Sequence, residues 1–455
     1  MALDVEGKKV TVVGLGRSGE AAARLLVQRG AWVTVTDRRS EAELEGPLTT
    51  LKKEGSVRYR IGGHPESAFQ EAELIVISPG IPLEGVEEVQ AAQAGGVPVI
   101  GEIELGYGFA KAPIVAVTGT NGKSTTAALT GEILKAAGRR VFVGGNLGRP
   151  LCEAVLERTE WDWIVVEVSS FQLETVRTFR PRVAALLNVT PNHLDRYRSF
   201  EDYLAAKMRI FENQTADDTA VVNADDALVF ERTDSVRSRR VFAGRSPRPA
   251  PGVYLDSERL VAVGVSAPAE RVEILRRKEI PLPGSHNLEN VLAASAVGIV
   301  CGCAPDRIRE AVMGFKGLEH RLEPVRIRNG VLYVNDSKAT TVAALAKALE
   351  AFNEPVVLIA GGRDKGGDFT LLRDLIRHRV KSALLIGEAR PTLRAAWGDL
   401  LHVLEADNLE EAVQRAAREA VSGDVVLLSP ACSSFDMFRD FEDRGRRFRE
   451  AVNRL

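Results

Sequence analysis

The stretch Ile114-Val-Ala-Val-Thr-Gly-Thr-Asn-Gly-Lys-Ser-Thr-Thr126 decides the fold of this chain. An apolar run rich in β-branched residues ends in a glycine turn, and the turn delivers Lys123 and Ser124 to the expected start of a helix. In this order the backbone N–H groups and the positive end of the helix face bound phosphates, the lysine offsets their charge, and the hydroxyl reaches Mg²⁺. The stretch therefore predicts a nucleoside triphosphate site, with an ordinary strand, turn and helix as the alternative.

The loop is a variant of the usual phosphate loop. The usual spacing has a glycine five positions before the Gly-Lys pair, where this chain has Val117, and the nearest glycine is Gly119. The loop is thus tighter, with Thr-Asn inside it. We expect ATP to contact the loop and the first turn of the helix, at Gly119, Thr120, Asn121, Gly122, Lys123, Ser124 and Thr125.

Length and composition describe an ordinary α/β enzyme. The chain has 455 residues, of which 45% are apolar, 27% charged and 6% aromatic. At roughly 150 residues per domain, this length corresponds to about three domains. A net charge of −2 and the lack of a long Lys/Arg block argue against a nucleic-acid or membrane surface.

The expected location is the cytosol. Nothing at the N-terminus resembles a signal peptide, and the longest weakly polar stretch, 291–304, is too short to span a bilayer. Four cysteines are too few and too scattered for a disulfide framework or a zinc site, so we interpret them as small buried hydrophobes in a reducing compartment. We expect a monomer that inserts into no membrane. The cysteines are Cys152, Cys301, Cys303 and Cys432.

Strand-like runs alternate with Ala/Leu-rich helical patterns, which is typical of βαβ units around parallel sheets. We predict three α/β domains: a Rossmann-like domain over 1–101, a central P-loop ATPase-like domain over 102–317, and a Rossmann-like domain over 318–455. Between about 220 and 285 the pattern is β-rich without clear boundaries. Strands are expected near Lys9–Val13, Trp32–Thr36, Leu74–Ser78, Trp163–Val168, Val183–Val189, Val331–Asn335, Val356–Ala360, Ala383–Ile386 and Val425–Ser429.

The first block contains the glycine fingerprint Gly14-Leu-Gly-Arg-Ser-Gly19 directly after a strand, with Asp37 at the end of the next one. This pattern favours a pyrophosphate at the helix start and a sugar on the acid. The ligand could be NAD(P), but a chain with a separate ATP loop has reason to bind another nucleotide diphosphate here. Asp37 with Arg38 and Arg39 could read the nucleoside or form a solvated loop, and Ser78-Pro79-Gly80 could equally be a plain turn.

Three polar residues of the second block are candidates for metal or phosphate chemistry. Glu167 interrupts a buried strand, and a carboxylate there is costly unless a cation accompanies it, for which Mg²⁺ is the natural choice. His193 follows the strand Val183–Val189 and is a metal or substrate ligand or a structural histidine. Lys207 lies on an amphipathic helix and by pattern alone would be exposed.

Motifs spread over the whole chain resemble those of the Mur ligase family, in the family's order. Among its members, those that add D-glutamate are the most similar in the glycine fingerprint, in Asp336-Ser-Lys-Ala-Thr340, and in the C-terminal run from Ser433 to Gly445. The other motifs are Gly119–Thr125, Glu167–Glu174, Asn188–Tyr197, His286–Asn290, His320-Arg321 and Leu428–Phe435.

The resemblance implies an amide-forming reaction of peptidoglycan precursor synthesis. ATP would phosphorylate the L-alanine carboxylate of UDP-N-acetylmuramoyl-L-alanine, and the amine of D-glutamate would attack the acyl phosphate to give a tetrahedral intermediate that expels phosphate. Phosphorylation supplies the leaving group that a carboxylate lacks, and Mg²⁺ and lysine offset the charge on the transferred oxygens.

The resemblance also implies the site residues, each of which has a plain alternative as a loop or capping residue. The UDP precursor would contact Gly16, Arg17, Ser18, Asp37, Arg39, Ser78, Gly80, Asn146 and His193. D-glutamate would contact Thr340, Lys365, Ser434 and Phe441. Beyond the phosphate loop, ATP would contact Asn287, Asn290, Arg321, Asp336 and Lys338. Two Mg²⁺ sites would use Ser124, Glu167, His193 and a carbamylated Lys207. The catalytic residues would be Lys123, Glu167, His193, Lys207 and Lys338.

Alternatives remain in the same and in other classes. Another Mur ligase or a folate-type polyglutamate ligase would share the ATP chemistry. An oxidoreductase that binds NAD at the glycine fingerprint would not use the ATP loop. A binding protein without turnover would not need the metal-binding and lysine residues. Asn192 stands where some relatives have an acid, and Arg17 could face the pyrophosphate or water. The family closes its third domain over ATP, so we expect a pivot near Gly317 and Leu318.

Overall fold

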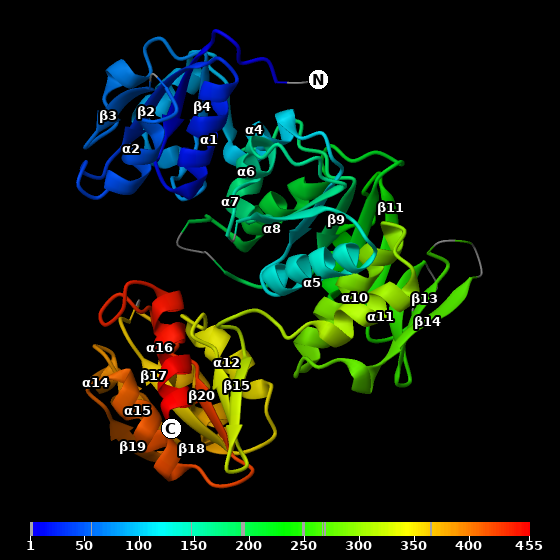
Figure 1. The fold of residues 1–455 in the computed structure, drawn as a ribbon, viewed down its shortest axis with the longest axis vertical. Coiled ribbons are helices and arrows are strands. Elements are labelled where there is room, and N and C mark those ends of the chain that lie inside the picture. Colours follow the sequence, from blue (N-terminus) through cyan, green and yellow to red (C-terminus); the bar gives the residue numbers. More distant parts are fainter. Residues whose placement is uncertain are drawn as a thin grey trace. The chain divides into compact units, whose positions relative to one another are not determined.

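The computed structural model describes residues 3–55, 57–146, 148–192, 196–247, 251–265, 267, 270–364 and 366–455. The chain is α/β, as predicted, with three sheets that helices flank (Figure 1). It forms two compact units, of which the first comprises Met1–Ile280 with Glu289–Gly314 and the second Pro281–Leu288 with Phe315–Leu455. The helix α10, Ser285–Val300, spans the sequence boundary between them.

The N-terminal sheet has five parallel strands in the order β3-β2-β1-β4-β5. Its order reverses direction at β1, so the loops after β1 and β4 flank a switch point where α/β proteins bind ligands. The strands are β1 Lys9–Val13, β2 Trp32–Asp37, β3 Val57–Ile61, β4 Leu74–Ile77 and β5 Val99–Gly101. The helices are α1 Arg17–Gln28, α2 Glu45–Leu51 and α3 Glu87–Ala94.

The central sheet has nine strands in the order β14-β13-β12-β11-β10-β9-β6-β8-β7. Pairs from β7 to β12 are parallel, whereas β12, β13 and β14 pair antiparallel as a meander at one edge. The strands are β6 Ile114–Thr118, β7 Val141–Gly145, β8 Trp163–Glu167, β9 Val183–Leu186, β10 Thr219–Asn223, β11 Arg239–Gly244, β12 Gly252–Asp256, β13 Arg259–Val263 and β14 Arg271–Arg276. The helices are α4 Glu102–Phe109, α5 Lys123–Ala136, α6 Leu151–Leu156, α7 Ser170–Leu173, α8 Phe200–Met208, α9 Ala227–Arg232 and α11 Pro305–Gly314.

The C-terminal sheet has six strands in the order β15-β16-β20-β17-β18-β19, parallel except for β15. Its central strands β17 and β20 are fully buried and consist of Val, Leu and Ile with few exceptions, as sheets covered on both faces require. The strands are β15 Glu323–Arg328, β16 Val331–Asn335, β17 Val356–Gly361, β18 Val380–Ile386, β19 His402–Glu405 and β20 Val425–Leu428. The helices are α12 Val342–Glu350, α13 Arg373–Arg379, α14 Arg390–Trp397, α15 Leu409–Glu419 and α16 Phe441–Arg454.

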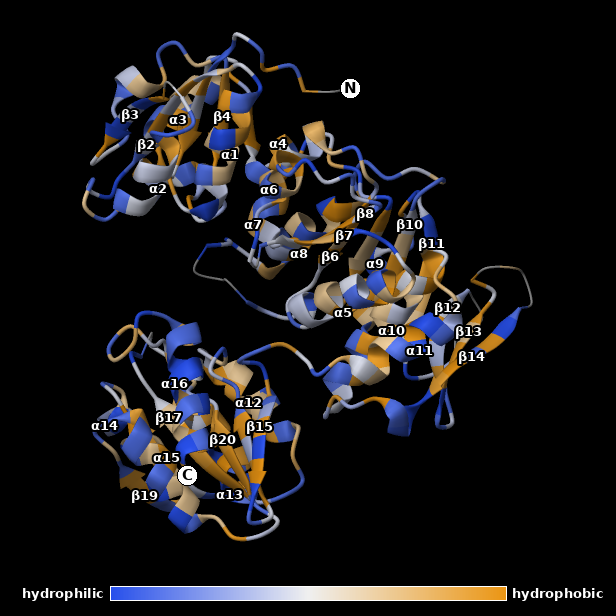
Figure 2. Cartoon of the chain, in the orientation of Figure 1, coloured by the Kyte–Doolittle hydropathy of each residue, from blue (hydrophilic) through white to orange (hydrophobic). Residues whose placement is uncertain are grey.

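Apolar residues gather in the strands of each sheet, and the flanking helices carry polar residues outward (Figure 2). None of the helices in the described part of the chain is both long and apolar enough to cross a membrane. The predicted strands match the observed ones within one or two residues, except that Val183–Val189 ends earlier, at Leu186, and the strand predicted from Ala383 begins at Val380. We did not predict β3, β7, β15 and β19, because these strands are half-exposed, glycine-containing or at an edge and give a weak apolar pattern.

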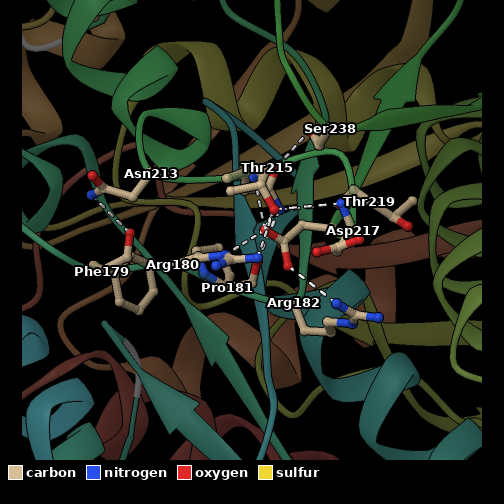
Figure 3. Close-up of polar contacts among 11 residues, drawn as sticks. Phe179, Arg180, Pro181, Arg182, Asn213, Thr215, Asp217, Thr219 and Ser238 are labelled. Atoms are coloured by element: carbon tan, nitrogen blue, oxygen red, sulfur yellow. Dashed lines mark hydrogen bonds and ion pairs between the residues drawn. The ribbon is translucent and has the colours of Figure 1, made fainter. Parts of the chain in front are cut away.

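A polar network closes the amino edge of the central sheet, opposite the phosphate loop (Figure 3). The buried Asp218, just before β10, accepts hydrogen bonds from Arg180 Nε (2.6 Å) and from the backbone N–H of Thr215 (2.9 Å). The buried Gln214 donates to Pro181 O (2.9 Å) and accepts from Ser238 Oγ (2.8 Å). The network thus joins the segments that lead into β9, β10 and β11, and each buried polar group in it has a partner.

Asp218→Asn is expected to lower the free energy of unfolding by about 1 to 3 kcal/mol, because the buried acceptor loses its charge while Arg180 and the Thr215 N–H remain. Asp217→Asn is the matched control, since Asp217 is exposed. Thermal and urea unfolding measure both. Equal stability of the two variants would contradict a structural role of the network.

Candidate active site

The phosphate loop joins β6 to α5 at the carboxyl edge of the central sheet. Gly122 caps α5 in the left-handed conformation (φ +82°), and the helix begins at Lys123. A Cβ on Gly122 would collide with Asn290 Oδ1, so this position requires glycine for its backbone and for the close approach of Asn290. Lys123 Nζ donates to the carbonyl oxygens of Gly119 (3.0 Å) and Thr120 (2.9 Å).

Asn188, which follows β9, holds the tip of this loop. Its side chain accepts from the Asn121 N–H (2.8 Å) and donates to the Asn121 carbonyl (3.2 Å), and its own carbonyl accepts from the Thr120 N–H (2.8 Å). Three bonds from one residue therefore fix the backbone that faces the expected phosphates. We assigned Asn188 no role from the sequence, although it opens one of the quoted motifs.

Glu167 ends β8 beside the start of α5, and the residue is 4% exposed. One carboxylate oxygen accepts a short hydrogen bond from Ser124 Oγ, and the other accepts from Asn146 Nδ2 (2.9 Å). The Asn146 N–H also donates to the Glu167 carbonyl (2.8 Å). A carboxylate and a hydroxyl at the phosphate loop are the hard oxygen ligands that Mg²⁺ prefers, so the donor set fits the expected metal.

Lys207 lies on α8 with its side chain inside the protein, and the residue is 2% exposed. Its Nζ donates to Gly119 O (2.9 Å) and lies 4.6 Å from the centroid of the Tyr203 ring. Burial, followed by the positive charge of Lys123, lowers the pKa of Lys207 to about 6 against the opposing effect of Glu167. The helical pattern predicted an exposed lysine at this position. That prediction is wrong, because the packing of α8 against the phosphate loop buries the side chain.

The N-terminal sheet bears a cavity of about 550 Å³ at its switch point. Seven of the nine residues expected to contact the UDP precursor line it, and the other two are Asn146 and His193. The seven are Gly16, Arg17, Ser18, Asp37, Arg39, Ser78 and Gly80, and Gly14, Arg38 and His64 line the cavity as well. A Cβ on Gly19 would collide with the Gly14 carbonyl, which explains the third glycine of the fingerprint. Ser78 Oγ donates to the same carbonyl (2.9 Å) and joins the two loops at the switch point.

Asp37 lines this cavity and holds the neighbouring backbone in place. Its buried carboxylate accepts from the Leu15 N–H (2.7 Å) and from the guanidinium of Arg39 (2.8 Å). Burial opposes ionisation of Asp37, but the hydrogen bonds from Arg39 and Leu15 outweigh it and lower the pKa of the carboxyl. Asp37 thus holds the glycine loop, and its expected contact with a nucleoside stays a prediction.

The loops after β16 and β20 form a polar edge in the second unit. Asp336 accepts from the Leu322 N–H (3.1 Å) and from Ser429 Oγ (2.9 Å), and its complete burial raises the pKa of the carboxyl to about 7. Lys338 Nζ lies 4.2 Å from the centroid of the Phe441 ring, an arrangement in which the ring stabilises the cation. The Thr340 N–H bonds to Lys338 O (2.9 Å). Four of the expected ligand residues therefore share this edge: Asp336, Lys338, Thr340 and Phe441.

Arg444 joins these loops from α16 and is fully buried. It donates to Ser337 O (2.8 Å) and to Cys432 O (3.2 Å), and Ser337 Oγ in turn donates to Phe441 O (2.8 Å). Burial lowers the pKa of Arg444 to about 10. Arg444 lies within a quoted motif, but its role could not be predicted from the pattern, because only the fold buries the guanidinium against the Ser337 and Cys432 carbonyls.

The remaining predicted residues lie as follows. Asn290 Oδ1 accepts from Thr126 Oγ1 (3.3 Å), and Asn287 Nδ2 donates to Pro283 O (2.7 Å). Arg321 directly precedes Leu322, whose N–H binds Asp336. His193 and Lys365 lie outside the described residues. Within the described ranges no three His, Cys, Asp or Glu side chains gather as a metal site would require.

One edge of the central sheet carries the phosphate loop, the carboxylate of Glu167 bonded to Ser124 and Asn146, and the two lysines Lys123 and Lys207. The fold and this site define an α/β enzyme that uses a nucleoside triphosphate. Three family descriptions match the chain: Mur ligase MurD-like N-terminal domain over 8–101, Mur ligase middle domain over 117–298, and Mur ligase glutamate ligase domain over 320–432. The chain belongs to the Mur ligase family.

Several relatives similar over their full length carry the name UDP-N-acetylmuramoylalanine--D-glutamate ligase. The protein of this name from Geotalea daltonii is 47% identical and covers 100% of this chain and 99% of its own. Those from Geobacter metallireducens and Syntrophotalea carbinolica are each 48% identical, with coverage of 99% or more of both chains.

Solved structures with the same fold are far more distant in sequence. UDP-N-acetylmuramate-alanine ligase MurC from Thermotoga maritima has a TM-score of 0.61 at 20% identity, over 98% of this chain and 99% of its own. A pseudomurein peptide ligase type C from Methanothermus fervidus has a TM-score of 0.60 at 21% identity, over 98% and 100%. These likenesses confirm the predicted α/β fold.

Gly122→Ala is expected to weaken ATP binding by about tenfold or more, because its Cβ displaces Asn290 and strains the helix cap. Gly138→Ala is the matched control, since Gly138 also has a positive φ (+78°) but no atom within 4 Å of the added Cβ. Calorimetric titration with a non-hydrolysable ATP analogue compares the two. A similar affinity in both variants would contradict the role given to Gly122.

Proposed function

We propose that this chain is an ATP-dependent ligase that joins D-glutamate to UDP-N-acetylmuramoyl-L-alanine in peptidoglycan precursor synthesis. The observation that carries the proposal is the carboxylate of Glu167, held by Ser124 and Asn146 at the start of α5. A buried carboxylate at a phosphate loop fits a metal-bound triphosphate, and relatives 45% to 48% identical over almost their full length are named for this activity.

The proposed reaction has two steps. The carboxylate of the precursor attacks the γ-phosphorus of ATP and becomes an acyl phosphate, which carries the leaving group that a carboxylate lacks. The amine of D-glutamate then attacks the acyl carbon, and the tetrahedral intermediate expels phosphate. The contribution of the protein is to hold three anions in reacting geometry and to offset their charge, for which Lys123 and Lys338 are suited.

The three substrates are assigned to the three predicted domains, with ATP contacted by two of them. The domain over 1–101 holds the UDP moiety in the 550 Å³ cavity, whose size suits a nucleoside diphosphate. The domain over 102–317 holds the triphosphate, and that over 318–455 holds the amino acid and completes the ATP site. Within the third domain, the D-glutamate residues are Thr340, Lys365, Ser434 and Phe441.

Mg²⁺ is proposed at two sites, with Ser124 and Glu167 as ligands of the first and His193 and a carbamylated Lys207 as ligands of the second. When bound, Mg²⁺ supplies positive charge to the oxygens of the transferred phosphoryl group. A carbamate forms when a neutral amine attacks CO₂ and loses a proton, and the buried position of Lys207 disfavours its charged form. The carbamate would turn this amine into an anionic oxygen ligand.

The proposed setting is a monomer in the cytoplasm whose third domain closes over ATP at Gly317 and Leu318. Gly317 has a positive φ (+85°), which suits a pivot because glycine adopts such backbone freely. All four cysteines are free, as in a reducing compartment.

Phosphate release from ATP and Mg²⁺ with UDP-N-acetylmuramoyl-L-alanine tests the function directly. D-glutamate alone is expected to support turnover, with L-glutamate, L-alanine, L-lysine and meso-diaminopimelate as the comparison. Turnover with another amino acid only would move the chain to a different substrate within the family. No turnover with any of them would contradict the ligase assignment.

Lys207→Ala is expected to lower kcat by about 100-fold or more, because the second metal site loses an anionic ligand. Small carboxylic acids with bicarbonate are expected to restore part of the activity in this variant. Lys135→Ala is the control on a neighbouring helix, since the Lys135 side chain is 50% exposed. An unimpaired Lys207→Ala would remove the carbamate assignment, as would an impaired variant that no small acid restores.

A further inference from the structure

Arg196 joins two loops of the first unit that carry different parts of the site. Its Nη1 donates to Pro79 O (3.0 Å), in the loop after β4 that lines the precursor cavity. Its Nη2 donates to Glu174 Oε2 (2.9 Å), directly after α7. The helix α7 follows the strand that ends in Glu167, so one guanidinium connects the precursor loop with the segment behind the expected metal ligand.

The surroundings of Arg196 hold it in this position. The side chains of Arg196 and Glu174 are 16% and 22% exposed, and the guanidinium carbon lies 3.9 Å from the centroid of the Phe171 ring. The Glu174 carbonyl also accepts from Arg209 Nη1 (2.6 Å). A planar guanidinium that binds two acceptors and stacks on a ring has little freedom, and an ammonium group cannot replace it in all three contacts.

From Glu174 the contacts continue to the phosphate loop. Tyr197 donates from its hydroxyl to Glu174 Oε1 (2.5 Å), and its ring lies 5.3 Å from that of Tyr203, centroid to centroid. The Tyr203 hydroxyl bonds to Thr120 Oγ1 (3.1 Å), inside the phosphate loop. Direct contacts therefore link Pro79 to Thr120 without a gap.

We propose that Arg196 and Tyr197 are positioning residues that couple binding of the UDP precursor to binding of ATP. A precursor bound against the Ser78–Gly80 loop would restrict the position of Pro79 and, through its carbonyl, of Arg196. The contacts of Arg196 with Glu174, of Glu174 with Tyr197, and of Tyr197 with Tyr203 would then restrict the position of Thr120 in the phosphate loop. The inference rests on the proposed function, since the two ligands are the precursor and ATP. The test therefore measures the coupling itself.

The experiment is calorimetric titration of UDP-N-acetylmuramoyl-L-alanine into the protein with Mg²⁺, in the presence and absence of a non-hydrolysable ATP analogue. The ratio of the two Kd values is the coupling factor. We expect a factor of about 10 in the wild type and below about 2 in Arg196→Ala, within the usual range of such couplings. Arg196→Lys is expected to lie between them.

The Kd of the analogue alone is expected to stay within about twofold of the wild type in every variant, a result that loss of folding would not give. Tyr197→Phe keeps the ring and removes the bond to Glu174, so it also lowers the factor and carries the test if Arg196→Ala does not fold. Arg198→Ala is the matched control. Arg198 pairs with Glu84 (2.8 Å) of the N-terminal segment, but the two side chains are 83% and 78% exposed, and such pairs contribute little.

Each result decides between the alternatives. A reduced factor in Arg196→Ala and Tyr197→Phe with an unchanged factor in Arg198→Ala supports the proposal. An unchanged factor in Arg196→Ala, or a factor near 1 in the wild type, overturns it and leaves the proposed function intact. Failure of the wild type to bind the precursor at all would overturn the proposed function itself.

Discussion

The carbonyl oxygen of Gly119 accepts hydrogen bonds from two lysines, Lys123 at 3.0 Å and Lys207 at 2.9 Å, and the rest of the site depends on how these amines share it. Two charged amines on one acceptor repel each other, and one of them is buried. The conflict is relieved because burial and the charge of Lys123 lower the pKa of Lys207 to about 6, so its amine is mostly neutral at pH 7. The loop therefore offers one fixed cation to phosphates and one reactive amine beside it.

At each of the three sheets, a polar side chain holds the backbone of a loop in place by hydrogen bonds. Asn188 holds the phosphate loop, Asp37 holds the glycine loop of the N-terminal sheet, and Arg444 holds the loops of the C-terminal sheet. In each case one polar side chain, buried for Asp37 and Arg444 and half-buried for Asn188, bonds to backbone N–H or carbonyl groups of a loop at a carboxyl edge. A reaction between three anions gains most from such positioning, because little reorganisation remains when the charges meet.

Local patterns predicted the parts of the site that local sequence determines. The phosphate loop and Glu167 were predictable, since a strand, its glycine turn and an acid in a buried run are all visible within a few residues. Lys207 and Arg444 were not predictable from pattern, because contacts between segments far apart in the chain bury them. The contact of Asn146 with Glu167 was not predictable from pattern either, because it pairs residues 21 positions apart at the ends of two strands, and the expected contact of Asn146 with the precursor stays a prediction.

The central claim is that the carboxylate of the precursor is phosphorylated at this loop. The most direct measurement uses UDP-N-acetylmuramoyl-L-alanine with ¹⁸O in its carboxylate, together with ATP, Mg²⁺ and D-glutamate, followed by mass spectrometry of the released phosphate. The carboxylate oxygen that attacks the γ-phosphorus leaves with it, so the account predicts a single ¹⁸O atom in each phosphate formed. Phosphate that carries no label while the amide product accumulates would contradict the account.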